Sequence, residues 1–89
     1  MLFALVDLAL GMAQLAGERE RVVAALPVEI AGVIPRSFNA RSDTYEIIRT
    51  CLDYPGGLQA LLGFLQGFGG ESPAFGEFRR AVVRLLYGG

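Results

Sequence analysis

The amino-acid sequence predicts an all-α protein, a compact bundle of five to six short helices around a single core. Apolar residues recur every three or four positions in each segment, and no segment alternates apolar and polar residues as a half-buried strand does. Twelve glycines and four prolines among 89 residues divide these segments from one another. The apolar fraction of 53% suffices for one small core. Residues 1–87 are therefore expected to form one domain, with Gly88 and Gly89 as a linker or chain end.

A first helix is expected between residues 2 and 16. Its apolar side chains form two faces, one of Leu5, Leu8, Met12 and Leu15 and the other of Phe3, Val6 and Leu10. Asp7 and Gln14 alone make a polar strip, and such a helix is central in a bundle or covered by a partner. Gly17 stands where a left-handed C-cap is expected. The run is too short to span a bilayer and lacks the basic start of a signal peptide, so we expect a cytoplasmic chain without a membrane partner.

Two short helices are expected next, over residues 18–26 and 27–34. Their buried residues are expected to be Val22, Val23 and Leu26 in the first helix and Ile30, Val33 and Ile34 in the second. Pro27 suits a first helical turn. Pro35 ends the second helix, because the residue before a proline disfavours the helical region. Residues 36–41 then form the longest loop.

A longer helix is expected after this loop, capped by Ser42 or Asp43, since Asp43 and Glu46 have capping-box spacing. Its buried residues are expected to be Tyr45, Ile48 and Leu52 with Cys51 beside them, and its wet residues Glu46, Arg49, Thr50 and Asp53. The helix must end at the corner of Tyr54, Pro55, Gly56 and Gly57, because proline cannot continue it. Glycine there supplies a positive φ angle without a Cβ penalty.

Two more helices complete the bundle. The fifth carries one apolar stripe, made of Leu58, Leu61, Leu62, Leu65 and Phe68, and Phe64 falls off that stripe. Residues 67–70 are expected to break the chain. Ser72 and Pro73 then give an N-cap and a first turn. In the last helix we expect Phe75, Phe78, Val82 and Leu85 to face inward and Glu77, Arg80 and Arg84 to face outward.

The residues that are missing exclude most chemistry. The sequence has no histidine, and all eight of its basic residues are arginine. It therefore lacks a histidine base or metal ligand, a Schiff-base lysine and a P-loop lysine. Cys51 is the single cysteine and reads as a core residue. The net charge of −1 offers no footprint for nucleic acid. We expect no enzyme activity, no cofactor and no metal; an enzyme built from carboxylates alone would have to use Glu29 with Asp43 or Asp53.

The stretch from Thr50 to Leu58 resembles the effector-associated domains of bacterial conflict systems, in particular the second type. Further matches are Leu26-Pro27 with Glu29-Ile30, Ile34-Pro35-Arg36, Ala40-Arg41 with Asp43, and Gly70 with Ser72. The resemblance implies a non-catalytic adaptor with a death-like helical fold. It also implies that the domain brings an effector together with a STAND-type NTPase or another sensor that carries a matching domain. The partner is then a protein with such a domain, and a homo-oligomer is possible.

Two groups of residues are candidates for the contact surface. The corner from Tyr54 to Gly57 is either a hinge alone or a hinge that also contacts a partner. The second group is Arg36, Arg41 and Asp43. These side chains either pair within their loop or offer an arginine guanidinium for a bidentate contact with a partner's carboxylate. The full candidate surface consists of Arg36, Arg41, Asp43, Glu46, Asp53, Tyr54, Pro55, Gly56, Gly57, Phe64, Arg80 and Arg84.

The charges suggest how copies could meet. Residues 72–89 carry a net charge of +2 and residues 42–62 a net charge of −2. These surfaces either neighbour each other within one chain or meet head to tail between copies, which allows open assemblies. The alternative to a protein-binding module is a helical bundle that binds a lipid or small ligand in a continuous internal cavity.

Overall fold

The computed structural model describes residues 2–69 and 72–88, and of Ala13, Gln14, Phe68 and Gly69 the backbone only. The helices of this part are α1 (Leu2–Leu10), α2 (Ala13–Gly17), α3 (Arg19–Ala25), α4 (Val28–Ala31), α5 (Ala40–Asp53), α6 (Gly57–Gly69) and α7 (Pro73–Tyr87). None of the described residues lies in a strand. The all-α bundle is confirmed, with more helices than predicted. The predictions for the side chains of Gln14 and Phe68, and for Gly70 and Gly89, fall outside the described residues.

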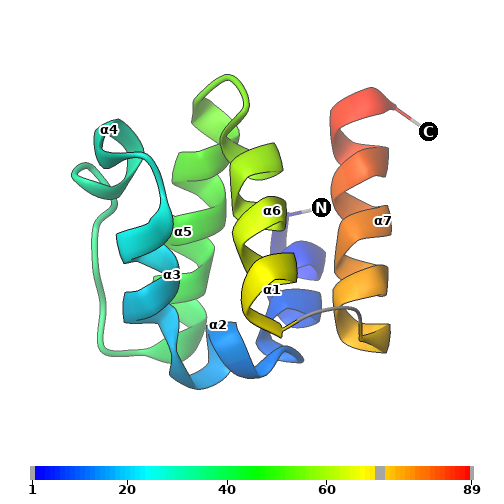
Figure 1. Cartoon of the computed structure of the whole chain (residues 1–89), viewed down its shortest axis with the longest axis horizontal. Coiled ribbons are helices and arrows are strands. Elements are labelled where there is room, and N and C mark those ends of the chain that lie inside the picture. The colour runs from blue at the N-terminus through cyan, green and yellow to red at the C-terminus, as the bar shows by residue number, and fades with distance from the viewer. Residues whose placement is uncertain (1, 70–71, 89) are drawn as a thin grey trace.

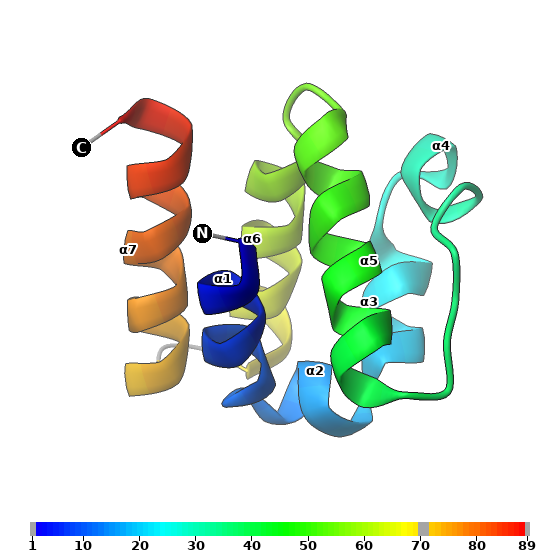
Figure 2. The same ribbon diagram turned by 180° about the vertical axis from the view of Figure 1, so that it is seen from behind.

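Helix α1 is the centre of the arrangement, as its apolar character predicted. It packs against α5 on one side and α7 on the other, and α6 also contacts both of these helices. Figures 1 and 2 show α1 and α6 between α5 and α7, with α2 passing beneath and α3 and α4 at the edge beyond α5. Helices α5 and α7 therefore turn their outer faces to different sides of the molecule.

The predicted first helix is two helices, because the chain turns at Gly11. The amides of Gly11 and Met12 donate to the carbonyls of Leu8 (3.1 Å) and Ala9 (3.0 Å), a tight turn that ends α1. The turn directs α2 toward α3, α5 and α6. Phe3, on the second apolar face of α1, is two-thirds exposed, so this end of that face is not covered within the chain.

The segment between α2 and α5 corrects two further predictions. Gly17 does not have a positive φ angle; of the glycines described, only Gly56 and Gly88 do. Helix α4 is a single turn that buries Ile30, and the following chain buries Ile34 but leaves Val33 half-exposed. Because a single helical turn ends at Ala31, the three residues no longer share one helical face.

The N-cap of α5 lies earlier than predicted. The side chain of Asn39, not Ser42 or Asp43, accepts a hydrogen bond from the Ser42 amide (3.0 Å). The helix therefore starts at Ala40, and Arg41 belongs to the helix rather than to the loop. Asp43 lies inside the helix, where its carboxylate is taken up by arginines.

The buried face of α5 is rotated from the one predicted. It consists of Asp43, Thr44, Ile47, Ile48, Thr50 and Cys51. Tyr45 is half-buried and Leu52 is 36% exposed, whereas Thr50, predicted on the wet face, is buried. Contacts with α1 and α6 determine which face of α5 is buried. The sequence of α5 alone therefore does not reveal this rotation.

The corner between α5 and α6 uses its two glycines differently. Gly56 has a φ angle of 77°, in the region where a Cβ is costly. Gly57 begins α6, and a Cβ there would stand 2.1 Å from the Cys51 carbonyl oxygen. The hinge prediction is confirmed, and the second glycine is needed for close packing rather than for its φ angle.

Helices α6 and α7 follow the predictions more closely. Leu58, Leu61 and Leu65 are buried, and α6 continues through Gly69, so Gly67 does not break it. Ser72 caps α7, since its Oγ accepts from the Phe75 amide (3.1 Å). Pro73 occupies the first turn.

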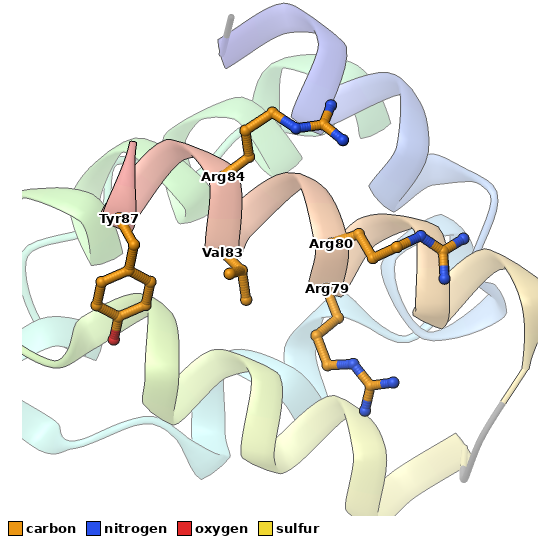
Figure 3. A pocket seen from close by; sticks show the side chains of 5 residues that line it. All are labelled: Arg79, Arg80, Val83, Arg84 and Tyr87. Atoms are coloured by element: carbon orange, nitrogen blue, oxygen red, sulfur yellow. The ribbon is translucent and has the colours of Figure 1, made fainter. Parts of the chain in front are cut away.

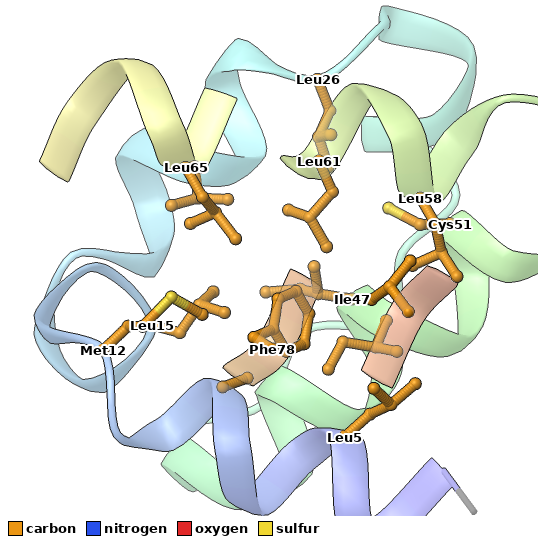
Figure 4. Packing of buried hydrophobic residues seen from close by; sticks show 14 of the residues in the cluster. Leu5, Met12, Leu15, Leu26, Ile47, Cys51, Leu58, Leu61, Leu65 and Phe78 are labelled. Atoms are coloured by element: carbon orange, nitrogen blue, oxygen red, sulfur yellow. The ribbon is translucent and has the colours of Figure 1, made fainter. Parts of the chain in front are cut away.

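The core is continuous from one end of the bundle to the other. Figure 4 shows side chains from several helices meeting around Phe78. Those labelled are Leu5, Met12, Leu15, Leu26, Ile47, Cys51, Leu58, Leu61, Leu65 and Phe78. All of them are buried. The core therefore uses the inner faces of α5 and α7, and their outer faces point to solvent.

Candidate interaction surfaces

An ion cluster around Asp43 ties the loop before α5 to α3. The Asp43 carboxylate accepts from Arg36 Nε (2.8 Å), Arg36 Nη2 (2.7 Å) and Arg19 Nε (2.7 Å). The Ser37 amide also donates to it, at 3.2 Å, and the Asp43 side chain is 1% exposed. Arg36 makes a further ion pair with Glu20 (2.6 Å). The cluster joins α3, the loop and α5 into one unit.

The cluster shifts the ionisation of its members. Hydrogen bonds from Arg36 outweigh the burial of the carboxyl and lower the pKa of Asp43 from 3.8 to about 2. The Asp43 carboxylate in turn raises the pKa of Arg36. Of the two alternatives for this group of residues, the structure shows pairing within the chain for Arg36 and Asp43.

Arg41 lies apart from the Asp43 cluster and pairs with Asp7 of α1. Beside this pair, a groove of about 400 Å³ runs between α1 and α5. Its lining consists of Phe3, Val6, Arg41, Ser42, Tyr45 and Glu46. The rings of Phe3 and Tyr45 stack in the groove with centroids 5.6 Å apart.

The corner and the off-stripe aromatic are only partly accessible. Pro55 and Gly56 are exposed, Tyr54 is half-buried, and Gly57 is buried against the end of α5. Phe64 is half-buried and packs against the core. These residues therefore form a small rigid corner and a covered ring rather than one broad surface.

The structure locates the cysteine and the carboxylates that were considered for metal binding or catalysis. No group of three or more cysteine, aspartate or glutamate side chains among them could hold a metal ion. Cys51 is completely buried, and this burial raises the pKa of its thiol to about 12, which removes the thiolate that nucleophilic chemistry requires. Glu29 and Asp53 are exposed and so lack the desolvated setting that acid–base work needs. Asp43 is buried, but Arg36 and Arg19 hold it as a carboxylate.

The outer face of α7 is basic and partly apolar. Arg79, Arg80, Val83, Arg84 and Tyr87 line a shallow hollow of about 340 Å³. Figure 3 shows Val83 in its middle and Tyr87 at one end, with Arg79 and Arg84 extending to opposite sides. Val83 is 46% and Tyr87 69% exposed. Among the described residues, no carboxylate lies within ion-pair distance of Arg80 or Arg84.

The outer face of α5 carries the opposite excess of charge. Glu46, Arg49 and Asp53 lie at i, i+3 and i+7 and so share one helix face. That face is opposite the buried Ile47 and Cys51. None of the three takes part in an ion pair with another described residue.

Sequence reasoning missed several of these features. The ion pair between Arg19 and Asp43 was not predicted, because nothing in the sequence reports the distance between them. Phe38, in the loop before α5, is fully exposed. Tyr45 was expected inward and Phe3 on an apolar helix face. Their stacking at the edge of the groove was not predicted, because it depends on the rotation of α5.

No helix in the described part of the chain is long and apolar enough to cross a membrane. Comparison with curated proteins and with solved structures finds no match, so the death-like arrangement stays a prediction. Comparison with protein families finds one that matches residues 4–83, which is nearly the whole chain and includes all seven helices in whole or in part. The chain therefore belongs to the effector-associated domain 2 family.

Proposed function

We propose that this domain is a non-catalytic module that tethers an effector to a sensor or NTPase protein through like-with-like association, in bacterial defence or conflict signalling. Its family supports the link to effectors. The observation that carries the tethering part is the outer face of α7, where Arg80 and Arg84 stand beside the exposed Val83 and Tyr87. Arginines next to exposed aromatic and aliphatic side chains are typical of the centres of protein interfaces.

The alternative, a bundle that binds a lipid or small ligand, requires a cavity inside the core. The core side chains instead meet one another (Figure 4). The hollows described above lie on the outside of α7 and in the groove between α1 and α5. We therefore favour a protein partner over a ligand enclosed by the bundle.

The absence of a catalytic arrangement in the described residues agrees with the non-catalytic part of the proposal. Cys51 is inaccessible, and the acids Glu29 and Asp53 are exposed to solvent. A domain of this kind contributes binding, and the chemistry belongs to the effector that it recruits.

The test is binding between this domain and other domains of the same family from the same genome, measured by isothermal titration calorimetry. We expect at least one partner to bind, and the joint replacement of Arg80 and Arg84 by glutamate to weaken that binding. Arg21→Glu is the matched control, because Arg21 is exposed on α3, where it pairs with Glu18. The proposal fails if no partner binds and the domain does not self-associate.

A further inference from the structure

We propose that the outer face of α7 in one copy of this chain packs antiparallel against the outer face of α5, and against the groove between α1 and α5, in a second copy. This inference rests on the proposed function and names the two surfaces that it uses. It starts from charges that the fold of one chain leaves without partners.

Those charges form two matching stripes. On α5 the stripe is Glu46, Arg49 and Asp53, with a net charge of −1. On α7 it is Glu77, Arg80 and Arg84, with a net charge of +1. Both have the spacing i, i+3, i+7, so each stripe keeps to one side of its helix. None of these residues is in an ion pair with another described residue.

The two stripes cannot meet within one chain. Helices α1 and α6 pack against both α5 and α7 and lie between them (Figures 1 and 2). Of the two alternatives that the charges allowed, a contact within one chain therefore does not hold for α5, which carries the acidic charges. Segment 42–62 meets α7 only through the uncharged start of α6, where Gln59 donates a hydrogen bond to Tyr87. A contact between the stripes requires a second copy.

Charge complementarity fixes the direction of the contact. If α7 lies antiparallel on α5 with Arg80 opposite Glu46, then Glu77 lies opposite Arg49, because both pairs are separated by three residues. Both contacts join opposite charges. The parallel arrangement that places Arg80 opposite Glu46 brings Asp43 opposite Glu77, and Asp43 is buried and already bound to arginines. Only the antiparallel direction therefore makes two ion pairs.

The apolar side chains favour the same direction. Counted at 100° per residue, Tyr45 flanks the α5 stripe on the same side as Val83 and Tyr87 flank the α7 stripe. Side chains on the same side of each stripe meet when two facing helices are antiparallel and lie on opposite sides when they are parallel. The exposed Val83 and Tyr87 would then enter the groove where Phe3 stacks on Tyr45.

A contact between two different surfaces of the same domain is heterologous, so it joins copies head to tail into rings or open chains. The competing arrangement is a two-fold dimer through α7 alone. That arrangement would place two basic faces against each other, since α7 carries a net charge of +2. Like charges at an interface oppose association, and we therefore assign the acidic face of α5 as the partner.

The experiment measures self-association by sedimentation equilibrium at low and moderate salt. We expect Arg80→Glu and Glu46→Arg each to weaken association about tenfold or more. The double variant that carries both changes restores it, because every junction then joins opposite charges again. The control is Glu29→Arg, the same charge change on an exposed residue of α4, away from both stripes. Arg49→Glu and Glu77→Arg repeat the test on the second pair, should one of the first variants fold poorly.

The outcomes separate this inference from the proposed function. The inference is overturned if the unchanged chain stays monomeric, if Glu46→Arg associates like the unchanged chain, or if the double variant stays as weak as the single ones. Sensitivity to Arg80→Glu alone would indicate the α7 dimer instead. A monomeric chain that still binds another domain of its family would leave the proposed function standing.

Discussion

Replacing Asp43 by asparagine should destabilise the fold strongly, because it removes the buried carboxylate that joins Arg19 and Arg36. Asp43 accepts three short hydrogen bonds from Arg19 and Arg36, and its side chain is 1% exposed. Removal of one partner from a buried ion pair costs about 3–5 kcal/mol. The side chains of Arg19 and Arg36 are 17% and 33% exposed, so water recovers part of that cost. We expect a loss of about 2–4 kcal/mol in the free energy of unfolding.

The pKa of Asp43, which is lowered by the same hydrogen bonds, gives a value of similar size. It falls from 3.8 to about 2 on folding, which corresponds to roughly 2.5 kcal/mol at about 1.4 kcal/mol per unit. Because the folded pKa is the lower one, this contribution is complete above about pH 4 and is lost as the pH falls through about 2.

The assay is urea unfolding of the unchanged chain, of Asp43→Asn and of Asp7→Asn, at pH 7 and at steps down to pH 2. Asp7 is the matched control, since its pair with Arg41 is exposed and worth at most about 1 kcal/mol. At pH 7 the free energy of unfolding of Asp43→Asn should be about 2–4 kcal/mol below that of the unchanged chain. The reasoning is refuted if Asp43→Asn and Asp7→Asn have the same stability, or if the advantage of the unchanged chain over Asp43→Asn does not shrink below pH 4.

Three further predictions concern the corner, the last helix and the cysteine. In chemical unfolding, Gly57→Ala should lower the free energy of unfolding more than Gly56→Ala does. The Cβ at position 57 would stand 2.1 Å from a backbone oxygen, whereas Gly56→Ala costs about 1–2 kcal/mol for its positive φ angle. Equal losses would contradict the close approach at Gly57. Ser72→Ala should lower the free energy of unfolding by about 1 kcal/mol through the lost N-cap, and an unchanged value would mean that the cap is not formed in solution. Cys51 should resist a thiol reagent at pH 8 in the native protein and react in denaturant, because its thiol is buried with a pKa of about 12; rapid reaction of the native protein would show that the core opens there.

The parts of the fold that local chemistry determines could be predicted from the sequence. Ser72 and Pro73 started α7 as expected, and the corner with Gly56 has the predicted positive φ angle. Features that depend on distant residues could not be predicted. The N-cap of α5 is Asn39 rather than Ser42 or Asp43. The Asp43 carboxylate accepts a hydrogen bond from Arg19, 24 residues earlier in the chain.

The candidate surface shows the same division. The outward positions of Arg80 and Arg84 followed from helical periodicity, and the structure shows them exposed. Asp43 was a candidate for the interface because it is charged, but its side chain is buried within the domain and paired with arginine. The groove that holds Phe3 and Tyr45 escaped prediction, because it depends on how α5 is rotated against α1.

Mixing two complementary variants tests the central claim, like-with-like association through α7 and α5, most directly. Arg80→Glu and Glu46→Arg should each be largely monomeric alone in light scattering at low salt. In an equimolar mixture every junction between unlike variants joins Glu46 with Arg80 or their reversed equivalents, so we predict that assembly returns to the mass of the unchanged chain. A mixture in which both variants stay monomeric, while both melt like the unchanged chain, would contradict the claim.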